Sequence, residues 1–185
     1  MASTTLSFNF LFHVCNSEIL DLQGNNLQGT IPESIYDLPS LSLFDISNNT
    51  DLGGALDSRV GQLSSLARLM ASNTNLGGTI PDELYHLSRL QDVHLSHTNV
   101  TGPLTETIRF LNATLTELNL RNSRFSGQLP TALDSLTQLE KLFLNENKFT
   151  GTISDVVCSE RGIGPFKLFQ LEADCTIECN CNDYC

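Results

Sequence analysis

The sequence contains no tryptophan, and aromatic residues make up only 7% of its 185 positions. Because 40% of the residues are nevertheless hydrophobic, the core must be built mainly from aliphatic side chains. Cationic residues are also scarce: 10 Lys and Arg stand against 21 Asp and Glu, which gives a net charge of −11. Such a charge repels phosphate backbones and anionic lipid headgroups, so the composition argues against a nucleic-acid partner.

Long apolar runs and phosphotransfer motifs are missing as well. No stretch approaches the roughly 20 consecutive apolar residues of a membrane helix, so we expect no membrane span within this chain. The sequence also lacks a glycine-rich phosphate loop and the Val-Ala-Ile-Lys, His-Arg-Asp and Asp-Phe-Gly motifs, which excludes a protein kinase domain. We predict no bound cofactor.

One phrase recurs through most of the chain, and its first copy, over residues 20–32, reads L-D-L-Q-G-N-N-L-Q-G-T-I-P. The first anchor of the phrase returns at steps of 24, 25, 24, 25 and 24 residues, at Leu20, Phe44, Leu69, Val93, Leu118 and Leu142. A second apolar anchor follows two residues later, which is the period of a strand with one buried face. Every copy then has a glycine, which indicates a backbone bend that a side chain would obstruct.

Each phrase is followed by apolar residues three apart, as in Ile35 and Leu38, a spacing that fits one or two helical turns. A repeat therefore consists of a strand, a bend and a short helix. Such a unit is too small to close a core alone, so neighbouring repeats must stack and share their leucine rows. The predicted fold is an α/β repeat solenoid with a parallel β-sheet on its concave side and short helical or 3-10 segments on its convex side.

The pattern L-x-L-x-x-N-x-L-x-G-x-I-P resembles the plant-type leucine-rich repeat, and this resemblance implies a right-handed superhelix. We expect six repeats of 24–25 residues over residues 19–157, a partial N-terminal cap over residues 1–18 and a cysteine-rich C-terminal cap over residues 158–185. The consensus asparagine is present in three copies and replaced in the others by Thr74, Thr98 and Ser123. Side-chain oxygens at these positions are expected to bond the neighbouring turn's backbone.

The six cysteines lie outside the repeats, at Cys15, Cys158, Cys175, Cys179, Cys181 and Cys185. The tail resembles the cysteine-rich C-terminal caps of algal leucine-rich-repeat proteins, diatoms in particular, which implies disulfides there. Four thiolates could instead hold zinc, although structural zinc sites usually set their cysteine pairs well apart. Residues 12–15 are similar to the close of a plant-type N-terminal cap. Residues 1–14 have two possible interpretations: a signal peptide, or part of an N-terminal cap that lacks its true beginning. We favour the incomplete cap.

Three N-x-S/T sequons begin at Asn48, Asn99 and Asn112 and agree with a secreted, glycosylated protein. We expect Asn112 to lie on an exposed convex loop, where a glycan is best accommodated.

Side chains that flank the two buried anchors of each strand must face the concave surface, because side chains alternate along a strand. Arg68 beside Asp92, and Glu117 beside Lys141, predict cross-strand ion pairs worth only a few tenths to about 1 kcal/mol. Exposed Met, aromatic and Arg side chains are enriched in binding hot spots. The candidate ligand contacts are therefore Met70, His94, Arg121 and Phe143, together with Arg68 and Asp92.

Asp92, His94 and Ser96 contain the residue types of a hydrolase triad, but residues i and i+2 of a strand lie about 6.6 Å apart, whereas triad members need contacts near 3 Å. His94 with His97 lacks a third metal ligand beyond Asp92. We therefore predict neither a catalytic site nor a metal site.

These observations predict a non-enzymatic, extracellular or cell-surface module that binds a protein, peptide or glycan on its concave surface. In the family that the chain resembles, such modules serve as ectodomains of receptor-like kinases, as receptor-like proteins and as secreted inhibitors of cell-wall polygalacturonases. We favour a receptor-like ectodomain in the plasma membrane that works with a co-receptor. A secreted hydrolase inhibitor and a structural or adhesive wall protein remain the alternatives.

Overall fold

The computed structural model describes residues 17–153, 168, 170–174 and 178–179. The predicted disulfide cap, the alternative zinc site and Cys15 fall outside these residues; of Cys179 only the backbone is described. Among the helices of the described residues, none has the length and apolar character needed to cross a bilayer.

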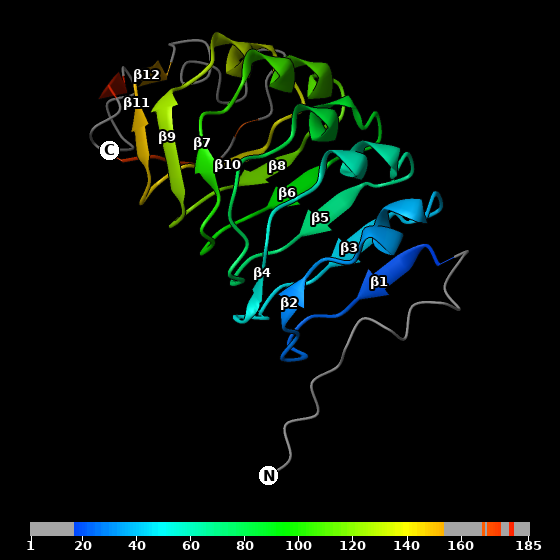
Figure 1. The fold of residues 1–185 in the computed structure, drawn as a ribbon. Coiled ribbons are helices and arrows are strands. Elements are labelled where there is room, and N and C mark those ends of the chain that lie inside the picture. Colours follow the sequence, from blue (N-terminus) through cyan, green and yellow to red (C-terminus); the bar gives the residue numbers. More distant parts are fainter. Residues whose placement is uncertain (1–16, 154–167, 169, 175–177, 180–185) are drawn as a thin grey trace.

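The main sheet contains seven parallel strands within this part of the chain and forms the concave side of a curved solenoid (Figure 1). Each strand has three residues, of which the central one is buried. The strands, in their order across the sheet, are β1 (Ile19–Asp21), β3 (Leu43–Asp45), β5 (Arg68–Met70), β6 (Asp92–His94), β8 (Glu117–Asn119), β10 (Lys141–Phe143) and β13 (Gln170–Glu172). The first six contain the predicted anchors. The seventh comes from the segment assigned to the C-terminal cap.

Short 3-10 helices form the opposite, convex side, as expected from the apolar spacing of three. In the described residues they are η2 (Glu33–Asp37), η3 (Ser58–Gln62), η4 (Asp82–His86), η5 (Glu106–Leu111) and η6 (Thr131–Ser135). Pro32, Pro81 and Pro130 precede three of them with φ between −69° and −72°, the angle that the proline ring imposes. At η3 no proline precedes the helix; Asp57 caps its N-terminus instead, because the Asp57 side chain accepts a hydrogen bond from the Arg59 N–H.

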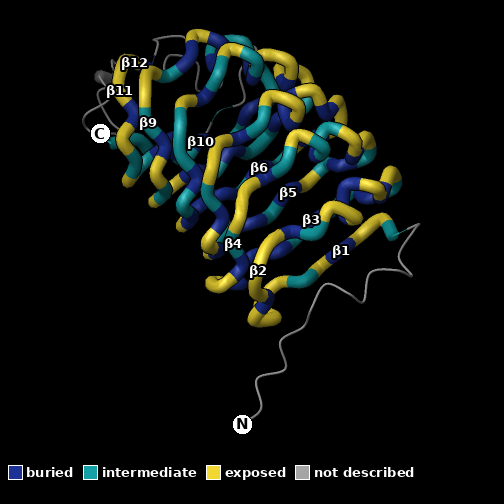
Figure 2. The backbone as a smooth tube through the Cα atoms, viewed as in Figure 1, coloured by how far each residue is buried: buried dark blue, intermediate teal, exposed yellow. Residues whose placement is uncertain are grey.

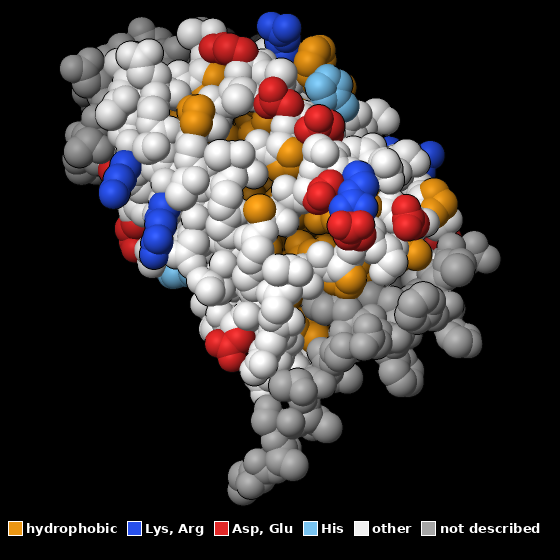
Figure 3. Space-filling view, in the orientation of Figure 1, with side chains coloured by type: hydrophobic (Ala, Val, Ile, Leu, Met, Phe, Trp, Pro, Cys, Tyr) orange, Lys and Arg blue, Asp and Glu red, His pale blue; other side chains and the backbone are white. Residues whose placement is uncertain are grey.

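Smaller parallel pairings run along the flank of the solenoid between the concave and convex sides. They comprise the sheet of β7 (Thr101–Gly102), β9 (Arg124–Gln128) and β11 (Lys148–Thr150), and the pairs β2 (Gly29–Thr30) with β4 (Leu52–Gly53) and β12 (Thr152–Ile153) with β14 (Glu178–Cys179). Glycine is required here: Gly54 has φ +81°, and a Cβ would lie 2.8 Å from Thr30 Cγ2. In Figure 3 the surface over β2, β4 and β7 is largely uncharged, and charged side chains gather over the 3-10 helices.

The core between the sheet and the 3-10 helices is a continuous stack of aliphatic side chains with a few phenylalanines and tyrosines. Buried positions recur along the backbone from turn to turn of the solenoid (Figure 2). Polar ladders hold the turns together. Asn49, which is 0% exposed, accepts hydrogen bonds at Oδ1 from the N–H groups of Asn25 and Leu27 and donates from Nδ2 to Leu22 O and Ile46 O. One buried amide thus satisfies backbone groups of two repeats.

The substitutes for the consensus asparagine behave differently from one another. Ser123 bonds the neighbouring turn as predicted, because its Oγ donates to Leu95 O and accepts from the Thr98 N–H. Thr74 Oγ1 instead donates to Ala71 O of its own repeat, and Thr98 Oγ1 to Leu95 O of its own repeat. The prediction is wrong for these two donations, since neither goes to the backbone of the neighbouring turn. Thr98 Oγ1 does meet the next repeat through a side chain, because it lies 3.1 Å from Ser123 Oγ.

Candidate functional site: the concave surface

The concave surface consists of the first and third residues of each main-sheet strand, which the strand register aligns in two rows. The first row contains Ile19, Leu43, Arg68, Asp92, Glu117, Lys141 and Gln170. The middle row contains Asp21, Asp45, Met70, His94, Asn119, Phe143 and Glu172. The six-strand register is the predicted one. The candidates Met70, His94 and Phe143 share the middle row, whereas Arg68 and Asp92 are direct partners in the first row.

The residues that follow the second anchor of each repeat also flank an anchor, so the sequence predicts that they form a third concave row; the structure corrects this in part. Ser47 is only 4% and Ser96 only 7% exposed, and Ser96 Oγ donates a hydrogen bond to Ser72 Oγ at 2.9 Å. The Ser96 side chain therefore bonds the preceding repeat and is not available on the concave surface. Arg121, in the same row, is exposed.

Glu117 is the centre of a charge cluster on β6, β8 and β10. Lys141 Nζ lies 2.8 Å from Glu117 Oε2, which confirms the predicted ion pair. His94 Nε2 lies 3.0 Å from Glu117 Oε1, although this buried nitrogen makes no aligned hydrogen bond. The hydrogen bond and the negative charge of Glu117 raise the pKa of Lys141. One carboxylate therefore faces two basic side chains.

Arg121 is joined to acidic side chains of the following repeats. Its Nη2 and Nε lie 2.7 and 3.0 Å from Glu146 Oε1, and its Nη1 lies 3.7 Å from Glu172 Oε2. With 45% of its side chain exposed, Arg121 presents a guanidinium to solvent, but its charge is already balanced within the chain.

The other predicted ion pair does not form. Arg68 and Asp92 are neighbours across β5 and β6, yet no ion pair joins them in the described structure. Asp92 Oδ1 instead accepts a hydrogen bond from Thr116 Oγ1 at 2.7 Å. A nearby neutral hydroxyl holds the carboxylate with less side-chain ordering than a long arginine would need.

The three residue types of a triad likewise face different partners. Asp92 bonds Thr116, His94 faces Glu117, and Ser96 bonds Ser72. Their side chains thus make no chain of contacts with one another, as the strand spacing predicts.

Comparison with known proteins agrees with this architecture. The Leucine Rich Repeat family model matches residues 16–38 and 114–136. The chain is similar to the plant peptide hormone receptor RGFR1 in its complex with RGF2, with 30% identity and a TM-score of 0.74 over 85% of this chain and 24% of that one. The fold is a leucine-rich-repeat solenoid.

Two further structures support the same fold. The LRR ectodomain of the Arabidopsis receptor kinase HAESA, in complex with an IDA peptide hormone ligand, is 29% identical, with a TM-score of 0.76 over 83% of this chain and 24% of that one. The BIR3–SERK2 complex from Arabidopsis thaliana is 29% identical, with a TM-score of 0.63 over 71% of this chain and 69% of that one. This chain thus spans about a quarter of the length of the first two. No curated protein matches it.

The three sequons of the solenoid differ in their surroundings. Asn112 is exposed at the C-terminal end of η5 on the convex side, as predicted. Asn48 is exposed, and its Oδ1 accepts a hydrogen bond from Asn73 Nδ2. Asn99 is half-buried, and its Nδ2, the atom that would carry a glycan, donates to Asn75 Oδ1. Asn112 and Asn48 are therefore exposed, whereas the Asn99 amide is half-buried and engaged.

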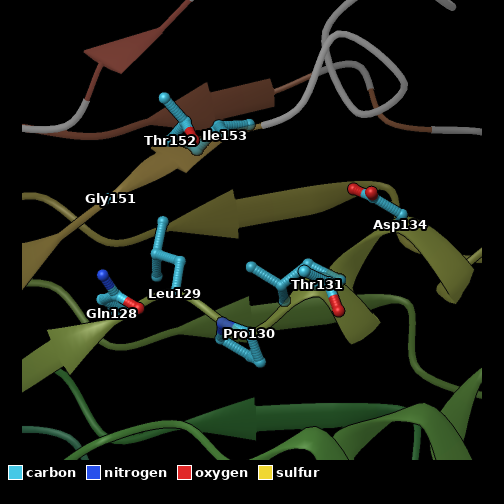
Figure 4. A pocket seen from close by; sticks show the side chains of 9 residues that line it. Gln128, Leu129, Pro130, Thr131, Asp134, Gly151, Thr152 and Ile153 are labelled. Atoms are coloured by element: carbon cyan, nitrogen blue, oxygen red, sulfur yellow. The ribbon is translucent and has the colours of Figure 1, made fainter.

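A cavity of about 250 Å³ lies away from the concave surface, between the start of η6 and β12 (Figure 4). Pro130 and Thr131 line one side, Gly151 and Thr152 line the other, and Asp134 contributes the charged group. The chain continues from this wall into residues 154–167, which are outside the described part. The cavity brings together no set of groups that would indicate chemistry.

Sequence reasoning missed two features of the solenoid's end. The first is the strand β13, whose Leu171 pairs with Leu142 across 171 − 142 = 29 residues, whereas the anchors of the six repeats follow one another at steps of 24 or 25 residues. The second is Asp174, which has a role similar to that of a consensus asparagine, because its two carboxylate oxygens accept hydrogen bonds from the N–H groups of Glu146 and Asn147 in the preceding repeat. Asp174 lies three residues after Leu171, whereas Asn147 lies five residues after Leu142, so the repeat pattern did not point to it.

Proposed function

We propose that this chain is a non-enzymatic recognition module that binds an extended peptide on its concave surface, as part of a receptor-like ectodomain at the cell surface. One observation carries the proposal: Met70, His94 and Phe143 lie in one row of a continuous parallel sheet, with half-buried side chains. Residues of these types are over-represented where binding energy is concentrated.

The dimensions of the row suit a peptide. Strands lie about 4.8 Å apart, so β5 and β10 are separated by roughly 14 Å, and an extended chain rising about 3.3 Å per residue crosses that distance with four or five residues. A sheet held by buried hydrogen bonds such as those of Asn49 is preorganised, so binding does not have to order the receptor surface.

The structural neighbours support a peptide ligand. RGFR1 is described in complex with RGF2, and the HAESA ectodomain with a peptide hormone ligand. HAESA has also been solved with its hormone and the co-receptor SERK1 together, which supports a co-receptor as a second partner of this chain. The exposed sequon at Asn112 suits an extracellular location.

The test is a selection of phage-displayed random peptides of about twelve residues, long enough to cross the sheet at ~3.3 Å per residue, on the immobilised full chain. Synthetic copies of the enriched peptides are then titrated against variants. Phe143→Ala should weaken binding by about 1–3 kcal/mol, as expected for an aromatic contact residue.

Phe110→Ala is the matched control, because Phe110 is 50% exposed but belongs to η5 on the convex side. It should leave the affinity unchanged. Equal binding by wild type and Phe143→Ala, or equal losses in the two variants, would show that the peptides do not use the concave surface.

A further inference from the structure

The N-terminal part of the concave surface presents two carboxylates that form no ion pair with any residue in the described part of the chain. Asp21 of β1 and Asp45 of β3 are direct partners in the middle row, so their side chains lie on adjacent strands about 4.8 Å apart. Each uses Oδ1 to accept a backbone hydrogen bond two residues on, from the N–H groups of Gln23 and Ser47. No ion pair reaches either carboxylate in the described residues.

The C-terminal part of the same surface differs, because its charges balance one another. Glu117 is paired with Lys141 and faces His94, and Arg121 is paired with Glu146. A ligand gains little from a charge that must displace an existing partner. The electrostatic preference of the surface is therefore set mainly by β1 and β3, where two like charges lie side by side.

Apolar side chains surround these carboxylates. Ile19, 61% exposed, and the half-buried Leu43 precede Asp21 and Asp45 by two residues on their strands, and Met70 is the partner of Asp45 on β5. Lysine and arginine match this combination, because their aliphatic stems pack on apolar surface while their charged ends reach polar groups. Two carboxylates on adjacent strands do not supply the six or more oxygen ligands that Ca²⁺ takes.

We infer that β1, β3 and β5 form a subsite for a basic peptide segment: a lysine or arginine side chain between Asp21 and Asp45, with an apolar neighbour against Leu43 and Met70. The inference rests on the proposed function, since it assigns one end of the same peptide site. Arg68, in the first row of β5 and without an ion-pair partner among the described residues, favours an acidic or carbonyl group of the ligand at the far side of the subsite.

Other occupants have weaker complementarity. Residues 1–16 contain no lysine or arginine, so the chain's own N-terminal segment offers no side-chain cation to the two carboxylates. A second copy would carry the same net charge of −11, and the repulsion between two such chains opposes self-association.

The experiment repeats the peptide selection with a charge-matched pair of variants. Asp21→Asn/Asp45→Asn removes both charges but keeps an Oδ1 acceptor for the Gln23 and Ser47 N–H groups, so the strands should remain intact. Asp37→Asn/Asp51→Asn is the control, because it changes the net charge equally at two exposed residues, one at the end of η2 and one in the turn before β4. Thermal unfolding and sedimentation of each variant verify fold and monomeric state.

Peptides selected on wild type should be enriched in lysine and arginine. Their affinity should fall about tenfold in Asp21→Asn/Asp45→Asn, the sum of two modest exposed charge contacts, and should not change in the control. Wild-type binding should weaken with added salt, and the salt dependence should shrink in the double variant.

Two results would overturn the subsite: enriched peptides without basic residues, or equal affinities of the two double variants. The subsite would also be overturned if the wild type were a dimer that the Asp21→Asn/Asp45→Asn variant does not form. A second copy of the chain would then be the occupant, in place of a peptide. These outcomes are distinct from failure of the proposed function, in which Phe143→Ala leaves peptide binding unchanged. Loss of binding in Phe143→Ala, with full binding in Asp21→Asn/Asp45→Asn, would keep the peptide site and refute the basic subsite.

Discussion

Replacing Asn49 with alanine should destabilise the solenoid far more than an average polar substitution. The side chain is 0% exposed and accepts hydrogen bonds from the N–H groups of Asn25 at 3.0 Å and Leu27 at 2.9 Å. Alanine would leave both donors without an acceptor, the Leu27 group fully buried and the Asn25 group partly so. At about 1–3 kcal/mol for a buried unsatisfied group, and less for a partly buried one, the loss should be about 2–4 kcal/mol.

The chain itself supplies a graded comparison. At the equivalent position of a later repeat, Ser123 Oγ accepts from the Thr98 N–H and donates to Leu95 O. Asn49→Ser should therefore restore one acceptor and one donor, and cost about 1 kcal/mol less than Asn49→Ala. Asn112→Ala removes an exposed amide from the convex side and should change stability by no more than about 0.5 kcal/mol.

The measurement is urea unfolding followed by far-ultraviolet circular dichroism, on protein without glycans. The midpoint should fall in the order Asn112→Ala, Asn49→Ser, Asn49→Ala, with an unchanged slope. A loss below about 1 kcal/mol for Asn49→Ala, or no difference between the alanine and serine variants, would refute the argument that this side chain satisfies buried backbone groups.

Three further predictions use the same protein. Leu120→Ala, at a side chain that is 0% exposed, should cost about 2–5 kcal/mol in urea unfolding by leaving a cavity; a loss below about 1 kcal/mol would contradict its place as a buried anchor. In protein from a secretory host, Asn112→Gln should remove one glycan mass, whereas Asn99→Gln should leave the intact mass unchanged apart from the substitution; the reverse pattern would contradict the accessibility argument. The hydrogen bonds from Arg59 lower the pKa of Asp57 to about 2, so Asp57 stabilises the fold above its unfolded-state value and loses this effect as the pH falls towards 2. Wild type should therefore exceed Asp57→Asn in urea midpoint at pH values above about 4, and the difference should disappear near pH 2; a pH-independent difference would contradict the assignment.

The strand positions could be predicted because a repeat protein contacts mainly itself one period away. Once Leu20, Phe44 and their equivalents are aligned, the register of neighbouring strands and the identity of the two concave rows follow from the alternation of side chains. The ion pair between Glu117 and Lys141 follows in the same way, since both residues stand at the same place of adjacent strands.

The pairing of long or bent segments could not be predicted in this way. Asp92 accepts a hydrogen bond from Thr116 and forms no ion pair with Arg68, and Arg121 forms an ion pair with Glu146 of the next repeat. These partners depend on side-chain rotamers and on the path of the chain beyond the strand, which the repeat pattern does not specify. The burial of Ser47 and Ser96 depends on how sharply each turn closes over its neighbour. The seventh strand lacks the regular period that located the other six.

The sequence alone determined the repeat, the leucine core and the first two concave rows, because all of these depend on the period and on side-chain alternation. Only the tertiary structure decided which concave charges are already paired and which are available to a ligand. That distinction separates Asp21 and Asp45 from Arg121, and it arises because a charge on one repeat is balanced by side chains 24 or more residues away, whose reach the spacing of residues does not specify.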